Sequence, residues 1–141
     1  MAPGQTAGMR ALPILFALVL AGCVHSAPTV CQPGGRAMLT AELFFGRKTG
    51  ERLIGEDAWR RFLDQEVTPR FPNGFTVFDA AGQWRDTERG TLVREPSRVV
   101  LIALPDEPEG RERLRLVAEA YKRRFNQQSV GTILRPGCVS F

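Results

Sequence analysis

Six consecutive apolar residues at 99–104 (VVLIAL) constrain the fold of this chain more than any other feature. Successive residues of a β-strand point to opposite faces, so an apolar run without alternation predicts a strand covered on both faces. Residues 37–46 (AMLTAELFFG) have the same character, because Met38 and Phe44 add apolar side chains between those of the alternating set. These two segments are therefore predicted to be the central strands of a sheet, and the apolar run 99–104 ends a longer strand predicted at residues 91–104.

Two other segments show helical periodicity. Residues 55–68 carry apolar side chains three and four positions apart, and Pro69 ends the segment. Residues 111–127 follow an acidic, proline-containing loop and show a second stripe of this kind. The apolar positions are Trp59, Phe62, Leu63 and Val67 in the first helix and Leu114, Ala118, Tyr121 and Phe125 in the second. Both patterns predict amphipathic helices that bury one face.

Two further strands are predicted at residues 75–80, which 81–84 continue or bulge, and at residues 130–135. The order β-α-β-β-α-β is typical of the ferredoxin-like α+β fold, in which two helices cover one face of a four-stranded antiparallel sheet. The first and third strands are central in this fold, and they are the two segments that are apolar on both faces. The sequence therefore predicts a ferredoxin-like domain.

The start of the chain predicts targeting. Residues 11–20 (ALPILFALVL) form an apolar run of ten residues, too short to cross a hydrocarbon core needing ~20 residues but suited to a signal peptide. The run leads into Leu20-Ala21-Gly22-Cys23, which resembles the lipobox of bacterial lipoproteins. The alternatives are an ordinary signal peptide followed by a chance cysteine, and a short anchor helix.

We predict a signal peptide at 1–22, a lipid-bearing Cys23 with a short tether at 23–36, and one domain at 37–141. Lipid on Cys23, with palmitate as a typical acyl chain, would make the membrane a partner. Two or three acyl chains anchor a protein stably to a membrane, whereas a single acyl chain binds only reversibly. Val24 stands where the inner-membrane retention signal of enteric bacteria has Asp. The predicted location is therefore the cell envelope, at the periplasmic face of the outer membrane.

The other two cysteines, Cys31 and Cys138, are 107 residues apart and flank the predicted domain. An oxidising envelope compartment favours a disulfide between them. The predicted topology agrees, because the fourth strand runs antiparallel beside the first and brings the two positions together. Two unpaired thiols are the alternative. The chain has no cysteine and histidine cluster for zinc.

Charge and motifs exclude several classes of function. The 19 basic residues are spread among 15 acidic ones without a cluster, which argues against a nucleic-acid partner. The sole histidine, His25, lies in the tether, so Ser97 has no histidine partner for hydrolase chemistry. Residues 46–50 (GRKTG) lack the spacing of a phosphate-binding loop and are interpreted as a turn. No catalytic residue, metal site or cofactor is predicted.

Glu42 lies inside an apolar strand, which predicts a carboxylate that is either buried in an ion pair or lines a cleft. Its candidate partners are Arg70, Arg94 and Arg98. A structural ion pair is the favoured interpretation, and a ligand contact or general base is the alternative.

Trp84, beside charged residues, is either an aromatic platform for a ligand or a packed residue of the core. Tyr121 lies in the stripe of the second helix and is interpreted as a core residue with a satisfied hydroxyl group. The candidate ligand-binding residues are accordingly Glu42, Arg70, Trp84 and Arg94.

From about residue 31 onward the chain resembles a family of uncharacterised bacterial proteins with a domain of unknown function, whose members often carry signal peptides. The resemblance rests on several short stretches taken together. These are residues 41–46 (AELFFG), 67–74 (VTPRFPNG), 82–85 (GQWR), Arg94-Glu95 with Ser97, Tyr121-Lys122 through Phe125, and the closing residues 138–141 (CVSF). Asn73 stands where the family is expected to have Asp. The resemblance implies no activity and no ligand.

The predicted function is an envelope lipoprotein whose domain binds a small ligand or interacts with another protein. Because both central strands are apolar on both faces, one hypothesis is a homodimer that packs the sheet faces not covered by helices. The alternative is a cofactor-independent enzyme with a pocket on that face, an idea that rests on fold analogy. A deep pocket containing Glu42 and an arginine would favour the enzyme.

Overall fold

The structure is a computed structural model that describes Met1 and residues 30–141. The predicted signal peptide, the lipidation site at Cys23 and most of the predicted tether lie outside the described residues. Among the described residues, no helix combines the length and the apolar character that a membrane span requires.

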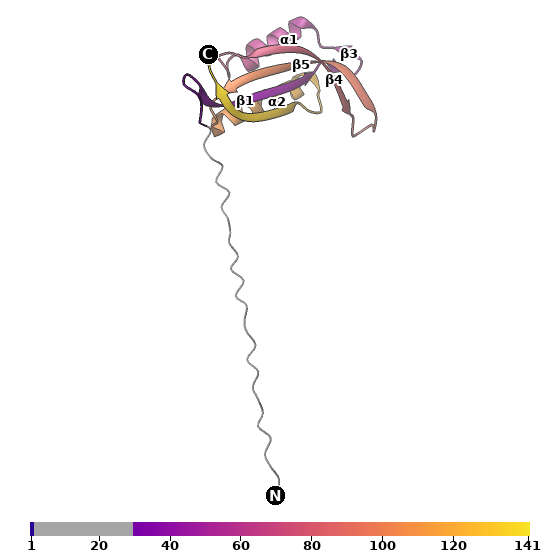
Figure 1. Ribbon diagram of the computed structural model, residues 1–141. Helices are drawn as coiled ribbons and strands as arrows, with labels where there is room; N and C mark the ends of the chain where they lie inside the picture. The colour runs from indigo at the N-terminus through magenta and orange to yellow at the C-terminus, as the bar shows by residue number, and fades with distance from the viewer. Residues whose placement is uncertain (2–29) are drawn as a thin grey trace.

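The principal strands are β1 (Arg36–Gly46), β4 (Thr76–Arg85), β5 (Leu92–Leu104) and β6 (Gly131–Val139). They form one antiparallel sheet in the order β4-β5-β1-β6 (Figure 1). The helices are α1 (Glu56–Phe62), which continues into a π-helical segment η1 (Leu63–Val67), and α2 (Pro108–Phe125). The ferredoxin-like arrangement predicted from the sequence is confirmed, and β1 and β5 are its central strands.

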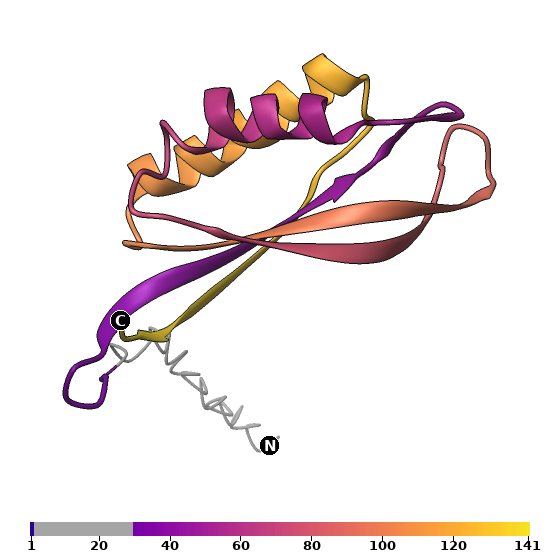
Figure 2. The same ribbon diagram turned by 90° about the horizontal axis from the view of Figure 1, so that it is seen from above.

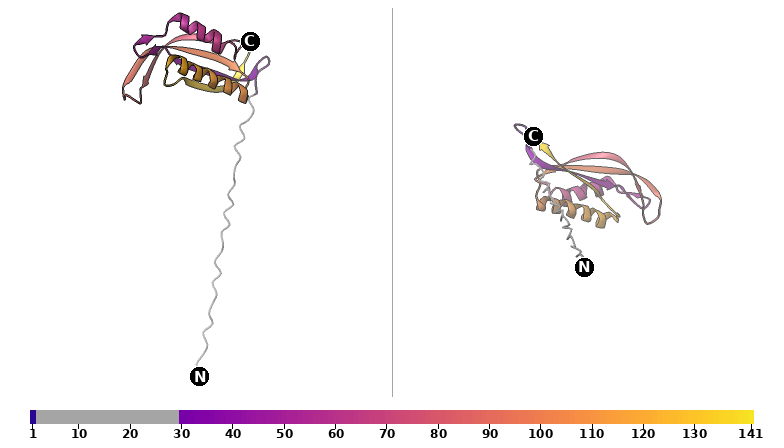
Figure 3. Two further views of the ribbon diagram at one scale, coloured as in Figure 1. Left: turned by 180° about the vertical axis from the view of Figure 1, so that it is seen from behind. Right: turned by 60° about the horizontal axis from the view of Figure 1, so that its bottom comes forward.

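Both helices lie on one face of the sheet, and the other face is open (Figures 2 and 3). Alternate residues of β1 (Leu39, Ala41, Leu43 and Phe45) and of β5 (Val100, Ile102 and Leu104) point to the helices and are at most 3% exposed. An aromatic cluster fills the space between sheet and helices: Phe45, Trp59, Phe62, Tyr121 and Phe125, with ring centroids 4.7–6.0 Å apart. Edge-to-face pairs of this kind add ~0.5–1.5 kcal/mol each beyond the burial of their area.

Three local features differ from the sequence prediction. The last strand continues beyond Arg135 to Val139, because an edge strand tolerates the missing N–H group of Pro136. The predicted turn after Gly46 contains a small hairpin of β2 (Lys48–Thr49) and β3 (Arg52–Leu53). The first helix widens at its end, where the Thr68 N–H donates to the Leu63 carbonyl at 2.8 Å, five residues back.

The open face of the sheet is partly apolar. The half-buried residues Phe44, Val99 and Leu101 lie beside Phe78 and Ile133, which are 49% and 38% exposed. This confirms that the two central strands are apolar on both faces. The homodimer that would pack two such faces together stays a prediction.

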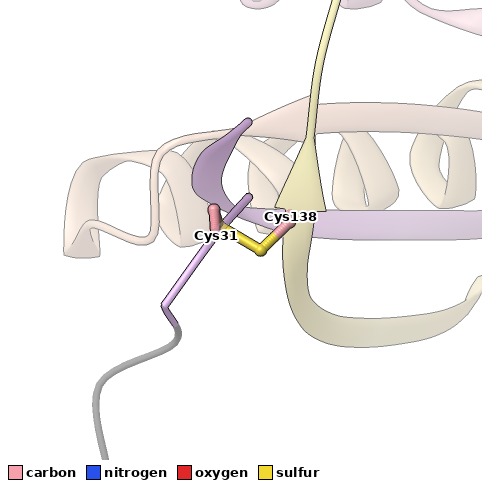
Figure 4. The surroundings of a disulfide bond; sticks show 2 residues. All are labelled: Cys31 and Cys138. Atoms are coloured by element: carbon pink, nitrogen blue, oxygen red, sulfur yellow. A yellow bond between two sulfur atoms is a disulfide. The ribbon is translucent and has the colours of Figure 1, made fainter. Parts of the chain in front are cut away.

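A disulfide joins Cys31 to Cys138, with their Cα atoms 5.5 Å apart (Figure 4). Cys138 pairs with Ala37 across the β1–β6 ladder, so the bond closes the end of the sheet where β1 begins and β6 ends. The pairing predicted from cysteine positions and topology is confirmed.

Replacing both cysteines by serine is expected to lower the free energy of unfolding by about 4–5 kcal/mol, because the unfolded chain regains the entropy of a loop of 107 residues. Urea titration followed by circular dichroism measures the change. The single replacement Cys31→Ser should give a similar loss, since the single and the double replacement both remove the cross-link. An unfolding free energy equal to that of the wild type would contradict the prediction.

Candidate functional site

A cavity of about 330 Å³ lies at the end of the open sheet face, opposite to the disulfide. Strands β1, β4 and β5 form its floor, and the α2–β6 connection lies at its side. We call this cavity the hairpin pocket, after the β4–β5 hairpin that contributes most of its residues. It is lined by Phe44, Gly46, residues 80–84, Glu95, Ser97, residues 127–129 and Gly131.

The strand register places the floor residues on one face. Ser97 of β5 pairs with Gly46 of β1 and with Ala80 of β4, and Glu95 pairs with Gly82. Because residues two apart on a strand share a face, the side chains of Glu95 and Ser97 both point away from the helices. The same alternation that sends Phe45 into the core therefore turns these polar groups toward the hairpin pocket.

Two strand glycines make room for the polar side chains. A Cβ atom on Gly46 would lie 2.6 Å from Glu95 Oε1, and a Cβ atom on Gly82 would lie 2.5 Å from Ser97 Oγ. Glycine inside a strand often marks such a close approach. Only glycine at these two positions lets the side chains of β5 lie flat over the neighbouring strands.

Glu95 is the central polar group, with only 8% of its surface exposed. Its Oε1 atom accepts a hydrogen bond from Trp84 Nε1 at 2.7 Å, and its Oε2 atom accepts one from the Lys48 backbone N–H at 3.0 Å. Both donors are neutral groups. Among the described residues, no basic side-chain nitrogen lies within 4.0 Å of this carboxylate, so it forms no ion pair with them.

The α2–β6 connection is held beside the pocket by side-chain amides. Asn126, at a positive φ of 50°, ends α2, and the Gln127 Nε2 group donates to the Lys48 carbonyl at 2.6 Å. Gln128 Nε2 donates to Asp86 at 3.4 Å. Asp86 is buried at the tip of the β4–β5 hairpin, and the backbone N–H of Arg89 holds the pKa of its carboxyl group below the usual value.

Tyr121 supports the pocket from the core side. Its hydroxyl group donates to the Gly46 carbonyl at 2.7 Å, which confirms that this hydroxyl is a satisfied core group. Burial raises the pKa of the phenol far above its ordinary value, so the group stays protonated as a hydrogen-bond donor. The end of β1 is thus fixed between the aromatic cluster and the Glu95 carboxylate.

The structure does not bring the four sequence candidates together. Trp84 lines the hairpin pocket, whereas Glu42 lies on the open face in an ion pair with Arg135. Arg70 pairs with Glu66 at 2.9 Å after η1, and Arg94 donates to Gln83 at 2.7 Å on the opposite face of the hairpin from Glu95. Of these residues, only Trp84 belongs to the pocket.

The predicted partners of Glu42 were wrong, although an ion pair was the right interpretation. Arg98 pairs with Phe45 in the ladder and therefore points to the helix side. There it bonds Glu56 at 2.8 Å and Asp79, with its guanidinium group 5.7 Å from the ring centroid of Trp59. Arg135 reaches Glu42 instead, because it lies two residues from Ile133, the cross-strand neighbour of Glu42.

Sequence reasoning missed Glu95 and the glutamines as site residues. A useful signal was present, because Gly46 ends the predicted strand 37–46 and Gly82 lies in the continuation at 81–84. Glu95 lies in the predicted strand that pairs with both. The glutamines had no such signal, since their place beside the pocket depends on where α2 ends. The described residues contain no group of histidine, cysteine or acidic side chains that could hold a metal ion.

Fold and pocket together define a ferredoxin-like α+β domain with a ligand-sized cavity at one end of its sheet. The chain belongs to the family described as protein of unknown function (DUF3574), whose model matches residues 40–141. The resemblance found from the sequence motifs is therefore confirmed at the level of the family. A search of curated proteins finds no match.

Several solved structures are similar to this chain. A phage SAM lyase in complex with S-methyl-5'-thioadenosine has a TM-score of 0.60 and 16% identity, and the match covers 82% of this chain and 97% of the lyase chain. The apo state of a phage SAM lyase has a TM-score of 0.58 and 15% identity, and the match covers 80% of this chain and 97% of the lyase chain. A CutA protein from Synechococcus elongatus PCC7942 has a TM-score of 0.49 and 11% identity, and the match covers 75% of this chain and 83% of the CutA chain. At these identities the lyase structures show a shared fold alone.

Gly46→Ala is expected to lower the free energy of unfolding by about 1–3 kcal/mol, because the added methyl group displaces the Glu95 carboxylate and breaks its hydrogen bonds. Thermal denaturation measures the loss. The indole N–H resonance of Trp84 should also shift, since that group donates to Glu95. Gly55→Ala is the matched control, as no atom lies within 4 Å of its added Cβ position. Equal stability of the two variants would refute this account of Gly46.

Proposed function

We propose that this chain is a cell-envelope lipoprotein whose domain binds a small molecule in the hairpin pocket. The buried Glu95 carboxylate in a cavity of about 330 Å³ is the observation that supports small-molecule binding most strongly. Ligand pockets commonly have volumes of ~300–1,000 Å³ and combine apolar walls with a few polar groups. Phe44 and Trp84 supply aromatic surface here, and Glu95 supplies the buried polar group.

The solved structures are compatible with this role. One phage SAM lyase structure holds S-methyl-5'-thioadenosine, so a domain with this fold can hold a small molecule. Neither that ligand nor that reaction is transferred to this chain at 16% identity. The proposal rests on the pocket of this chain.

The cofactor-independent enzyme is the alternative. The sequence favours an enzyme only if a deep pocket contains Glu42 and an arginine, and neither Glu42 nor any arginine lines the hairpin pocket. Glu95 is the one charged side chain among the lining residues, so no second charged group is placed to exchange protons with it. Binding is therefore better supported than catalysis, and also better than a protein-interaction module, because the polar groups converge in a cavity.

The disulfide, which includes the first cysteine after the proposed lipidation site, lies at the opposite end of β1 from the hairpin pocket. This strand has 11 residues, so its ends are about 33 Å apart at ~3.3 Å per residue. Cys31, which follows the proposed lipidation site Cys23 by eight residues, is at the first end, and Gly46 of the pocket is at the other. A domain anchored through Cys23 can therefore turn its pocket away from the membrane surface.

Native mass spectrometry of the full chain, purified from its own host in detergent, tests ligand binding. The wild type is expected to retain a small molecule, and Ala80→Phe is expected to lose it because the larger side chain fills the hairpin pocket. Ala103→Phe is the matched control. Ala103 shares the open face but does not line the pocket, so this variant should retain the molecule. A wild type without any bound molecule would count against the proposed function.

Metabolic labelling with radioactive palmitate tests the anchor. The wild type is expected to incorporate label, and Cys23→Ser is expected to lose all of it, because the thiol of Cys23 is the proposed acceptor. Cys138→Ser should keep the label, since Cys138 belongs to the disulfide. Label on the Cys23→Ser variant, or none on the wild type, would rule out the proposed lipidation.

A further inference from the structure

The charge of the hairpin pocket differs from that of the protein. The sequence contains 19 basic and 15 acidic residues, yet the residues lining the pocket include one carboxylate and no basic side chain. The helix end beside the pocket is the C-terminal end of α2, which carries the negative end of the helix dipole. An anionic ligand would find no compensating positive group among these residues.

Glu95 keeps hydrogen-bonding capacity for a ligand. An ionised carboxylate offers about four lone-pair sites, and the bonds from Trp84 and Lys48 use two of them. A buried carboxylate is strongly unfavourable unless it is paired, and its present donors are both neutral. A positively charged group placed at the two remaining sites would supply the missing counter-charge.

The neighbouring side chains also present acceptors. Gln127 and Gln128 use their amide nitrogens to hold the Lys48 carbonyl and the Asp86 carboxylate. Within residues 30–141, no hydrogen bond is donated to their amide oxygens, which can accept one from a ligand. Trp84 adds an aromatic surface, and aromatic rings attract cations through their π-electrons. The pocket therefore combines acceptors, one negative charge and an aromatic wall.

We propose that the hairpin pocket binds a small organic cation, an ammonium group carried on an apolar body. The ammonium group bonds Glu95, and the apolar body packs against Trp84 and Phe44. This inference rests on the proposed small-molecule function and names its ligand class. A cavity of 150 Å³ holds benzene, so about 330 Å³ has room for roughly a dozen non-hydrogen atoms.

The test uses nuclear magnetic resonance of the ¹⁵N-labelled full chain carrying Cys23→Ser, which lacks the proposed lipid acceptor. The protein has two tryptophans, so its indole N–H region reports the pocket through Trp84 and the core through Trp59. Three probes of nearly equal size are titrated: 2-phenylethylammonium, 2-phenylethanol and phenylacetate. The ammonium probe is expected to shift the Trp84 resonance saturably, with an affinity at least about tenfold above that of the alcohol, a difference of about 1.4 kcal/mol. Phenylacetate should not bind, and Trp59 should not respond.

Glu95→Gln separates the charge from the shape of the pocket. This variant is expected to bind the ammonium probe no better than the alcohol, while its affinity for the alcohol stays at the wild-type value. Glu88→Gln is the matched control, because Glu88 is exposed in the hairpin turn and lies outside the pocket. If Glu95→Gln does not fold, as judged by lost resonance dispersion, Glu95→Asp is used. Aspartate keeps the negative charge but has a shorter side chain, which moves the carboxylate away from the ligand. The affinity for the ammonium probe should therefore fall at least fivefold.

Three results would overturn the cationic ligand: equal binding of the alcohol or phenylacetate, ammonium binding that survives Glu95→Gln, or no response of Trp84 to millimolar ammonium probe. A neutral or anionic molecule retained in native mass spectrometry would also overturn it, yet would leave the small-molecule function intact. Retention of no molecule at all would remove the proposed function itself. The two failures are therefore distinguishable.

Discussion

β1 and β5 lie side by side at the centre of the sheet, paired from Leu39↔Leu104 to Gly46↔Ser97. The other elements take their positions from this ladder, since β6 pairs with β1, β4 pairs with β5, and both helices pack on one of its faces. One set of alternate side chains enters the aromatic core, and the other set faces the open side and the hairpin pocket. A shift of one residue would exchange the two sets, so a single backbone register specifies both core and pocket.

Gly46 is the point where the core and the hairpin pocket meet. The Tyr121 hydroxyl group bonds its carbonyl oxygen, and the Glu95 carboxylate lies over its Cα atom. Stability alone does not favour a buried carboxylate with neutral donors, because an apolar residue of similar size would avoid the desolvation cost. The Glu95 carboxylate holds Trp84 and Lys48 in place, and it is also the group on which the proposed small-molecule function rests.

The two ends of the sheet are held together by different interactions. At one end the disulfide ties Cys31 to the last strand, which holds the edge strand β6 against β1 beyond Pro136. At the other end the β4–β5 hairpin and the α2–β6 connection meet through Asp86 and Gln128. The cross-link thus stabilises the end of the sheet where β1 begins, and loops form the opposite end.

Sequence patterns predicted the order of the principal strands and helices, the two central strands, the favoured cysteine pairing and the core role of Tyr121. Each of these follows from local periodicity or from a topology with few alternatives, so short-range patterns were sufficient. The predicted partners of Glu42 failed because a one-residue alternation turned Arg98 to the helix side and brought Arg135 across from β6. The hairpin pocket, in contrast, depends on contacts between segments far apart in the chain. It needs Gly46, Glu95 and Gln127 from three separate segments to meet. The strand glycines give a local signal, but the contacts themselves depend on strand register and on where α2 ends.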